Sequence, residues 1–332
     1  MKRIFSAFFA LTIIASLLCR NVAPTKAEAA KQLSIGTTIF PDYDWVRQIL
    51  GDKFSDSDVT MLLDNGVDLH SYQPTVDDIV KIATCDLFIY VGGESDSWVE
   101  DALKHSVNKD MKVINLLEVL GDSVKAEETV EGMQETAHDH DEDDEDDDHE
   151  EHEEEKDEHV WLSLKNAKAL CDAISKALQE LDPDSKDIYA ANAEAYEKQL
   201  SALDEKYQEA VDNAAYKTLL FGDRFPFRYL TDDYGLRYYA AFSGCSAESE
   251  ASFDTIHFLA KKLDELELPC ILTIEGAKHR IAQTIVENTA KKNQTILSID
   301  SMQSTTSKDV AQGTTYLSVM EKNLDVLTDA LG

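Results

Sequence analysis

The sequence predicts an α/β protein of two lobes, each with a mainly parallel sheet flanked by helices, joined by one long rigid helix. Strand-like apolar runs alternate with helical patterns in both halves of the chain, which is typical of parallel sheets covered on both faces. Residues 185–214, between the two halves, contain neither glycine nor proline and place apolar side chains at helical spacing. With 332 residues and 43% hydrophobic content, the chain is long enough for two domains with cores of their own.

The first lobe is expected over residues 33–160. Its strand-like runs are 33–40, 59–63, 86–91 and 111–116, and its helical patterns begin at Pro41 and cover 77–83 and 98–103. After Asp86 the third of these runs is wholly apolar until Gly92-Gly93, as expected of a strand that is buried on both faces.

A helical connection is expected over residues 161–214. One helix runs from Leu164 to Leu181, and a second begins after the break at Asp182-Pro183-Asp184 and continues to about residue 214. A helix of about 30 residues spans about 45 Å, more than one lobe requires. A coiled-coil arm is the alternative, but the apolar positions keep no sustained heptad, so we favour a strut between the lobes.

The second lobe, expected over residues 215–332, repeats the alternation. Its strand-like runs are 218–221, 237–242, 270–274 and 295–299, and its helical patterns cover 227–233, 253–266, 281–292 and 316–331. Two lobes of similar make-up suggest an internal duplication, although the sequence shows no detectable repeat.

Residues 1–29 have the pattern of a signal peptide. Lys2 and Arg3 precede an apolar stretch from Ile4 to Leu18, which is too short for a comfortable membrane span. The segment could end at the Ala-x-Ala site of Ala27–Ala29, or Cys19 could be lipidated. We therefore expect an exported protein, periplasmic or on the cell surface, with a lipid anchor if Cys19 is modified.

Four further cysteines are Cys85, Cys171, Cys245 and Cys270, and none forms a CxxC pair. Export permits disulfides, but four cysteines allow three pairings and the sequence does not choose among them.

An acidic, histidine-rich run covers residues 138–159, and a loop is expected at about 134–158. The run holds sixteen acids, five histidines, one lysine and no hydrophobic residue, so it cannot form a packed core and predicts a solvated loop. A polyelectrolyte linker is the plain interpretation, but the interspersed imidazoles favour capture of divalent cations by His138, His140, His149 and His152.

The net charge of the whole chain, −34, argues against nucleic acid and anionic membrane surfaces as partners.

Polar side chains that follow the predicted strands are candidate ligands, because open α/β sheets bind ligands at the carboxyl ends of their strands. They are His70, His159, Asp223, Glu275 and Asp300. Each of them alone has a plain explanation, such as capping a turn. Because several metal-competent groups from two lobes converge on one edge, together they favour a metal site.

Catalytic motifs are missing from the sequence. His149-Glu150-Glu151-His152 lacks the HExxH spacing that places two histidines on one helical face. Neither a GxSxG motif nor a P-loop occurs, and the acidic run lacks the glycine of an EF-hand loop. We therefore expect a binding protein and not an enzyme.

From Leu33 to Gly332, the chain resembles the zinc/manganese substrate-binding proteins of bacterial ABC transporters. The motifs that carry the resemblance are Gly66-x-Asp68-x-His70-x-Tyr72-x-Pro74, the acidic loop ending in His159-Val160-Trp161-Leu162-Ser163, Ile299-Asp300-Ser301, and Tyr316-Leu317-x-x-Met320-x-x-Asn323-Leu324. The resemblance implies two α/β lobes joined by one long helix, a metal in the cleft between them, and delivery of that metal to a membrane permease.

The resemblance also implies a ligand set. His70 and His159 look like the first two ligands, and Asp300 resembles the carboxylate that manganese-type members contribute from the second lobe. The third ligand departs from the pattern, because ungapped comparison places Arg224 where the family has His or Glu, and a guanidinium has no lone pair to give. Shifting the comparison by one residue brings Asp223 to that place. Glu275 and His279, which follow the run 270–274, are reserve candidates at positions that the family does not use.

The sequence thus predicts the solute-binding component of an ABC importer, a monomer that captures Zn²⁺, with Mn²⁺ as the alternative cation, and presents it to a permease. An alternative from a different class is an exported metal-storage or surface-adhesion protein that binds cations through the acidic loop alone. A transport component should keep one tight metal site after the loop is removed, whereas a metal-storage protein that binds cations through the loop alone should not.

Overall fold

The computed structural model describes residues 32–134, 155–246, 250–276 and 278–332. The expected signal peptide with Cys19 lies outside these ranges, as do His138, His140, His149 and His152. The described helices include none that is both long and apolar enough to cross a membrane.

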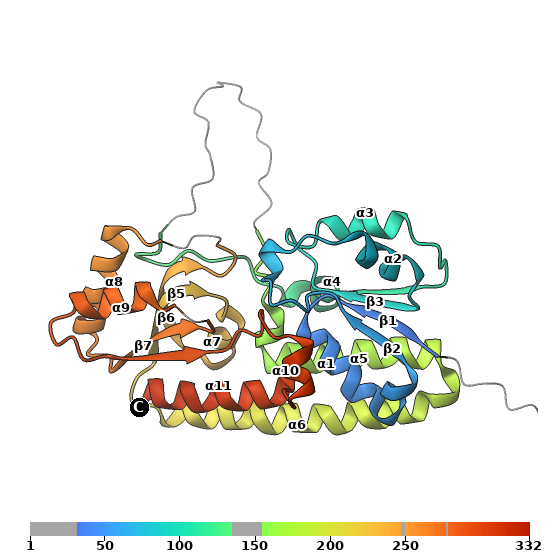
Figure 1. The fold of residues 1–332 in the computed structure, drawn as a ribbon. Coiled ribbons are helices and arrows are strands. Elements are labelled where there is room, and N and C mark those ends of the chain that lie inside the picture. Colours follow the sequence, from blue (N-terminus) through green and yellow to red (C-terminus); the bar gives the residue numbers. More distant parts are fainter. Residues whose placement is uncertain (1–31, 135–154, 247–249, 277) are drawn as a thin grey trace, which may run out of the picture. The chain divides into compact units, whose positions relative to one another are not determined.

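The first sheet has four parallel strands in the order β2-β1-β3-β4 (Figure 1). The strands are β1 (Ser34–Thr37), β2 (Asp58–Met61), β3 (Leu87–Tyr90) and β4 (Lys112–Asn115). In the register of the sheet, Ile35 pairs with Val59 on one side and with Leu87 on the other. All residues of β3 are buried, as the unbroken apolar run predicts.

The helices of the first lobe are α1 (Phe40–Leu50), α2 (Val76–Thr84), α3 (Trp98–Lys104) and α4 (Leu116–Leu120). Pro41 stands in the first turn of α1, and Thr75 begins α2 with a capping box that it shares with Asp78. The sequence did not predict α4, because five residues are too few to show a helical period; Asn115 caps it.

The second sheet is also parallel, in the order β6-β5-β7-β8. Its strands are β5 (Thr218–Phe225), β6 (Arg237–Ser243), β7 (Cys270–Ile274) and β8 (Thr295–Ile299), and its helices are α7 (Arg228–Tyr234), α8 (Phe253–Glu265), α9 (Arg280–Asn288), α10 (Ser307–Ala311) and α11 (Tyr316–Leu331). The register of β5 against β6 shifts between Phe221 and Arg224. The strand therefore continues beyond the predicted end at residue 221. Asp223 and Arg224 lie in its last part, next to the register shift, and not in a loop.

The long helix α6 (Lys186–Asn213) is confirmed as the connection between the lobes, and at 28 residues it spans about 42 Å. It follows α5 (Leu164–Leu181) and lies along both lobes in Figure 1. Asn192 donates to the carbonyl of Ile49 in the first lobe (2.9 Å), and Tyr207 donates to the carbonyl of Met320 in the second (2.7 Å). One hydrophobic core accordingly runs from β1 to α11, with a smaller core under α8 and α9.

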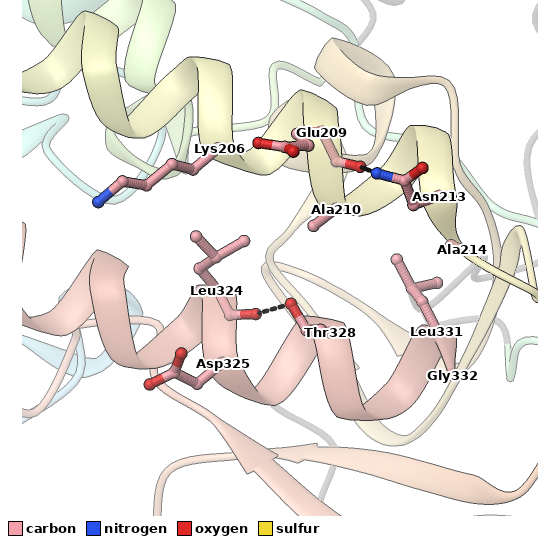
Figure 2. A pocket seen from close by; sticks show the side chains of 10 residues that line it. All are labelled: Lys206, Glu209, Ala210, Asn213, Ala214, Leu324, Asp325, Thr328, Leu331 and Gly332. Atoms are coloured by element: carbon pink, nitrogen blue, oxygen red, sulfur yellow. Dashed lines mark hydrogen bonds between the residues drawn. The ribbon is translucent and has the colours of Figure 1, made fainter.

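A groove of about 420 Å³ lies between the C-terminal parts of α6 and α11 (Figure 2). It arises because the small Ala210 and Ala214 leave space opposite Leu324 and Leu331. The two hydrogen bonds drawn there each stay within one helix, and the lining contains neither histidine nor cysteine. The groove is therefore a consequence of helix packing and not a candidate metal site.

Candidate metal centre

His70 stands on a short 3₁₀ turn, Leu69–Ser71, after the first lobe's strand β2. Asp68 caps this turn, since its Oδ1 accepts a hydrogen bond from the backbone N–H of His70 (3.0 Å). Leu69 anchors the turn in the core with 1% of its surface exposed. The cap and the anchor together fix the backbone from which the imidazole projects.

His159 is held at the other side of the site by buried neighbours. It precedes a 3₁₀ turn, Val160–Leu162, whose residues are all buried. Trp161 donates from Nε1 to the carbonyl of Ser301 (2.9 Å) and accepts on its own carbonyl from the hydroxyl of Tyr316 (2.7 Å). The His159 side chain has no exposed surface, so its ring is fixed by packing from both lobes.

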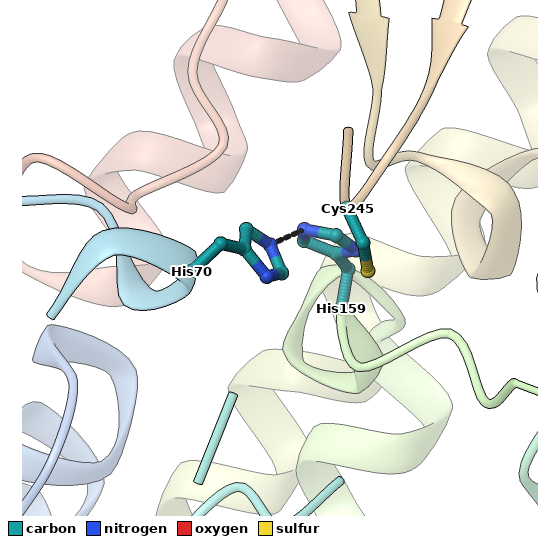
Figure 3. A group of neighbouring side chains, drawn as sticks. All are labelled: His70, His159 and Cys245. Carbon is teal, nitrogen blue, oxygen red and sulfur yellow. Dashed lines mark hydrogen bonds between the residues drawn. The ribbon is translucent and has the colours of Figure 1, made fainter. Parts of the chain in front are cut away.

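The two imidazoles meet with their Nε2 atoms 3.1 Å apart (Figure 3). His159 donates from Nδ1 to the carboxylate of Asp157 (3.0 Å), which leaves the lone pair on its Nε2. Nδ1 of His70 lies 2.7 Å from the hydroxyl of Ser95. Burial and the neighbouring His159 together lower the pKa of His70 to about 3, so this ring is neutral at pH 7. The two Nε2 atoms face one point, where a bound cation would replace the hydrogen bond that joins them.

Cys245 is the third member of the cluster (Figure 3). Its Sγ and one nitrogen each of His70 and His159 all lie within 4.8 Å of one another, and this is the group of metal-competent side chains found among the described residues. The cysteine follows the carboxyl end of β6 and carries a free thiol, as do Cys85, Cys171 and Cys270. From the sequence, Cys245 was expected only as a possible disulfide partner. Its position three residues after the predicted strand 237–242 was the signal that could have identified it.

The predicted ligands of the second lobe are not members of this cluster. Asp223, Glu275 and His279 line a separate cavity of about 760 Å³, and Oδ1 of Asp223 accepts from the backbone N–H of Arg224 (2.9 Å). Oδ1 of Asp300 accepts from the backbone N–H of Met302 (2.8 Å), and burial, together with the nearby Glu275, raises the pKa of Asp300 to about 6. The cluster of His70, His159 and Cys245 contains neither predicted aspartate, and their assignment as ligands stays a prediction.

Arg224, which the resemblance places at a ligand position, pairs with an acidic residue. Its Nη2 lies 2.6 Å from Oδ2 of Asp68, on the loop that carries His70. The guanidinium thus neutralises a carboxylate beside the site and cannot itself ligate a cation.

An acidic cavity of about 640 Å³ leads to the cluster and is lined by His70, Cys245, Glu94, Glu155 and Glu158, among others. Glu158 is 2% exposed; its Oε1 accepts from the backbone N–H of Ser95 (2.9 Å), while its Oε2 has no hydrogen-bond donor among the described residues. That Oε2 lies 3.5 Å from Nδ1 of the neutral His70. A buried carboxylate oxygen without a donor is costly, and a bound cation would offset that cost. The donor set therefore fits a divalent metal.

Packed structure resumes earlier than the sequence predicted, at Glu155 instead of His159. Lys156 pairs with Ala126 in an antiparallel bridge, and the backbone N–H of Asp157 donates to the carbonyl of Lys125 (2.9 Å). The polar residues just before His159 are thus bound to the first lobe. This attachment places the Asp157 carboxylate beside His159 and the Glu158 carboxylate beside His70.

Comparison with known proteins places this site in a family context. The chain matches the family model described as zinc-uptake complex component A, periplasmic, over residues 35–330. It is 31% identical over 327 residues to the zinc-binding lipoprotein AdcA of Streptococcus pneumoniae serotype 4, covering 98% of this chain and 60% of AdcA. It is 30% identical over 316 residues to the high-affinity zinc uptake system protein ZnuA of Bacillus subtilis, covering 94% of this chain and 92% of that protein.

The crystal structure of the Zn(II)-bound ZnuA-like domain of S. pneumoniae AdcA matches with a TM-score of 0.68 at 28% identity, over 91% of this chain and 99% of that domain. This chain spans 60% of the length of AdcA. The agreement with the ZnuA-like domain confirms the predicted fold of two parallel sheets joined by a long helix.

Proposed function

We propose, because the chain belongs to the family of periplasmic zinc-uptake complex components, that it captures zinc outside the cytoplasm and delivers it to the permease of an ABC importer. The family is one of transport components and not of enzymes, in agreement with the missing catalytic motifs. The observation that carries the proposal is the approach of the two imidazole Nε2 atoms to 3.1 Å in a buried site between the lobes.

Zinc suits this donor set. Zn²⁺ is bound by imidazole nitrogen at about 2.0–2.1 Å, and it takes three or four such protein ligands in tetrahedral sites. Manganese prefers carboxylate and water oxygens, and it remains the alternative cation because Asp223 and Asp300 are the predicted ligands of the second lobe. The relatives AdcA and ZnuA are named for zinc, which supports zinc as the first choice here.

The protein's own residues select and hold the cation without changing it. Asp157 and Ser95 orient the two rings through their Nδ1 atoms, so both Nε2 atoms face the same point. The buried turn Val160–Leu162 keeps water from one side of the site. A cation bound between the two imidazoles would connect His70 of the first lobe with His159, which directly precedes the turn whose Trp161 contacts Ser301 of the second lobe. The bound cation would therefore stabilise the packing of the two lobes against each other. A permease would recognise this packed, metal-bound form.

The expected signal peptide, the anchor at Cys19 and cation capture by the four loop histidines belong to the same proposal. They rest on sequence alone: a basic start followed by an apolar stretch, and a run that mixes carboxylates with imidazoles. Capture by the loop would raise the cation concentration near the acidic cavity lined by Glu94, Glu155 and Glu158.

The experiment is a zinc titration of the purified, metal-free protein, in competition with a chelator of known affinity. We expect one tight site per chain in a variant that lacks residues 138–152, and loss of that site when His70→Ala and His159→Ala are combined. Tight one-to-one binding by the double variant would refute the cleft site. A loop-deleted protein without any tight site would instead favour the metal-storage alternative.

A further inference from the structure

We propose that Cys245 supplies the second lobe's ligand, so that zinc is held by two imidazoles and one thiolate with a water molecule in the fourth position. The assignment rests on the zinc-capture function proposed above. It replaces the carboxylates that the family resemblance implied with a sulfur ligand, and it predicts a softer site.

The spacing of the three side chains fits tetrahedral zinc. With Zn–N at about 2.0–2.1 Å and Zn–S at about 2.3 Å, tetrahedral angles place two nitrogens about 3.3 Å apart and a nitrogen and a sulfur about 3.6 Å apart. The two Nε2 atoms are 3.1 Å apart, and the sulfur lies within 4.8 Å of one nitrogen of each ring. A displacement of about 1 Å, within the reach of a thiol rotamer, completes the geometry.

The backbone around Cys245 is built to bring the thiol to His159. A Cβ on Gly244 would lie 2.9 Å from Cε1 of His159, closer than side chains tolerate, so a residue without a side chain is required there. The backbone N–H of Cys245 donates to Oε1 of Glu127 in the first lobe (3.0 Å). The turn after β6 is thus fixed at both sides, and the thiol lines the same cavity as His70.

Cys245 also differs from the other described cysteines. Cys85, Cys171 and Cys270 are buried in the hydrophobic core, whereas Cys245 is half-buried beside polar groups. A free cysteine usually packs as a small apolar side chain, and the three core cysteines do so. Cys245 instead faces imidazoles, which is the environment of a metal ligand.

The second lobe's other candidates are engaged by the protein itself. Arg224 is paired with Asp68, Asp223 accepts from the backbone of β5, and Asp300 accepts from the backbone of Met302. A sulfur in their place favours zinc over manganese, because thiolates select softer metals. When zinc binds, the S–Zn bond forms, the S–H bond breaks, and the thiol proton leaves to water.

The test uses the full chain in a Cys19→Ser background, with Co²⁺ as a spectroscopic probe of the ligands. Thiolate bound to Co²⁺ gives a charge-transfer absorption in the near ultraviolet that nitrogen and oxygen ligands do not give. We expect this band in the parent protein and in the matched control Cys270→Ala, but not in Cys245→Ala or Cys245→Ser. Zinc affinity should fall at least tenfold in both Cys245 variants, while manganese affinity changes less.

A second measurement needs no variant of the site. Zinc should slow the alkylation of Cys245 by iodoacetamide at least tenfold, as followed by mass spectrometry of the peptide that contains it. The proposal is overturned if the Cys245 variants keep the band or the parent's zinc affinity, or if zinc leaves the alkylation rate unchanged. Loss of zinc binding in Asp223→Ala or Asp300→Ala, with Cys245→Ala unaffected, would return the second lobe's ligand to a carboxylate. Retention of tight binding in His70→Ala/His159→Ala would refute the proposed function instead, so the two failures are distinguishable.

Discussion

Arg224 Nη2 lies 2.6 Å from Asp68 Oδ2, and this ion pair joins the strand β5 of the second lobe to the loop that carries His70. Burial raises the pKa of Asp68, but its interactions with Arg224 and His70, taken together, lower it further than burial raises it, so the carboxylate stays ionised near neutral pH. The same carboxylate group accepts the backbone N–H of His70 through Oδ1. Arg224, which the resemblance places at a ligand position, therefore braces the loop that carries His70.

We expect Arg224→Ala to lower the free energy of unfolding at pH 7 by about 1–3 kcal/mol, because it leaves Asp68 partly buried without its partner. Because the folded pKa of Asp68 is depressed, this contribution is present above the unfolded pKa of about 4 and is lost as the pH falls below it. Denaturant unfolding at pH 7 and pH 3 measures both values. Arg224→Lys is the control, since it keeps the charge; an unchanged unfolding free energy in Arg224→Ala would contradict the prediction.

Asp157 is predicted to act as a positioning residue for His159. Asp157→Asn keeps the shape of the side chain but removes the charge that accepts from Nδ1, so the imidazole becomes a weaker ligand. We expect zinc affinity to fall by about 10–100-fold, as is usual when the carboxylate behind a metal-binding histidine is lost. Ser95→Ala, which removes the neutral partner of His70, should have a smaller effect. Wild-type zinc affinity in Asp157→Asn, measured on protein shown to be folded, would rule out this role.

We expect Asp96 to make the metal-free protein less stable as the pH rises. Burial raises its pKa to about 7, and the nearby Glu158 carboxylate also raises it, although the backbone N–H of Gly92 donates to it (3.1 Å). Its folded pKa lies above the unfolded value of about 4, so the folded state holds a proton that the unfolded state has lost. Stability should therefore fall between about pH 4 and pH 7, by up to about 4 kcal/mol from this group.

The measurement is the unfolding free energy of Asp96→Asn against that of the parent from pH 4 to pH 8. The variant should show a flatter dependence, with the difference growing as the pH rises. Asp122→Asn, at an exposed position of the same lobe, serves as the control. Parallel curves for Asp96→Asn and the parent would show that Asp96 carries no such proton.

Residues 138–152 are predicted to be dispensable for folding. They contain no hydrophobic residue, so their removal takes no apolar packing from the molecule. We expect the melting temperature of the metal-free protein to change little and several weak zinc sites to disappear, as titration calorimetry would show. Replacing the four histidines His138, His140, His149 and His152 by Asn provides a control of equal length. A large fall in melting temperature on deletion would mean that the segment supports the fold.

Local patterns in the sequence determined most of the elements, because periodicity and capping act over a few residues. The apolar run before Gly92-Gly93 forms the buried strand β3, and the stretch without glycine or proline forms α6. Elements too short to show a period were missed, namely α4 and α10. The end of β5 was placed too early because a register shift inside a strand leaves no mark in a hydrophobic pattern.

The sequence by itself also determined which two histidines belong to the candidate site, because His70 and His159 each stand in a recognisable local motif. Only the tertiary structure decided what surrounds them. Arg224 and Asp68 are 156 positions apart, and Cys245 reaches the histidines only because parallel pairing brings the end of β6 beside β5 and Gly244 admits His159. A lone cysteine or arginine carries no periodic signal, and its partner depends on distances that are set when the two lobes pack against one helix.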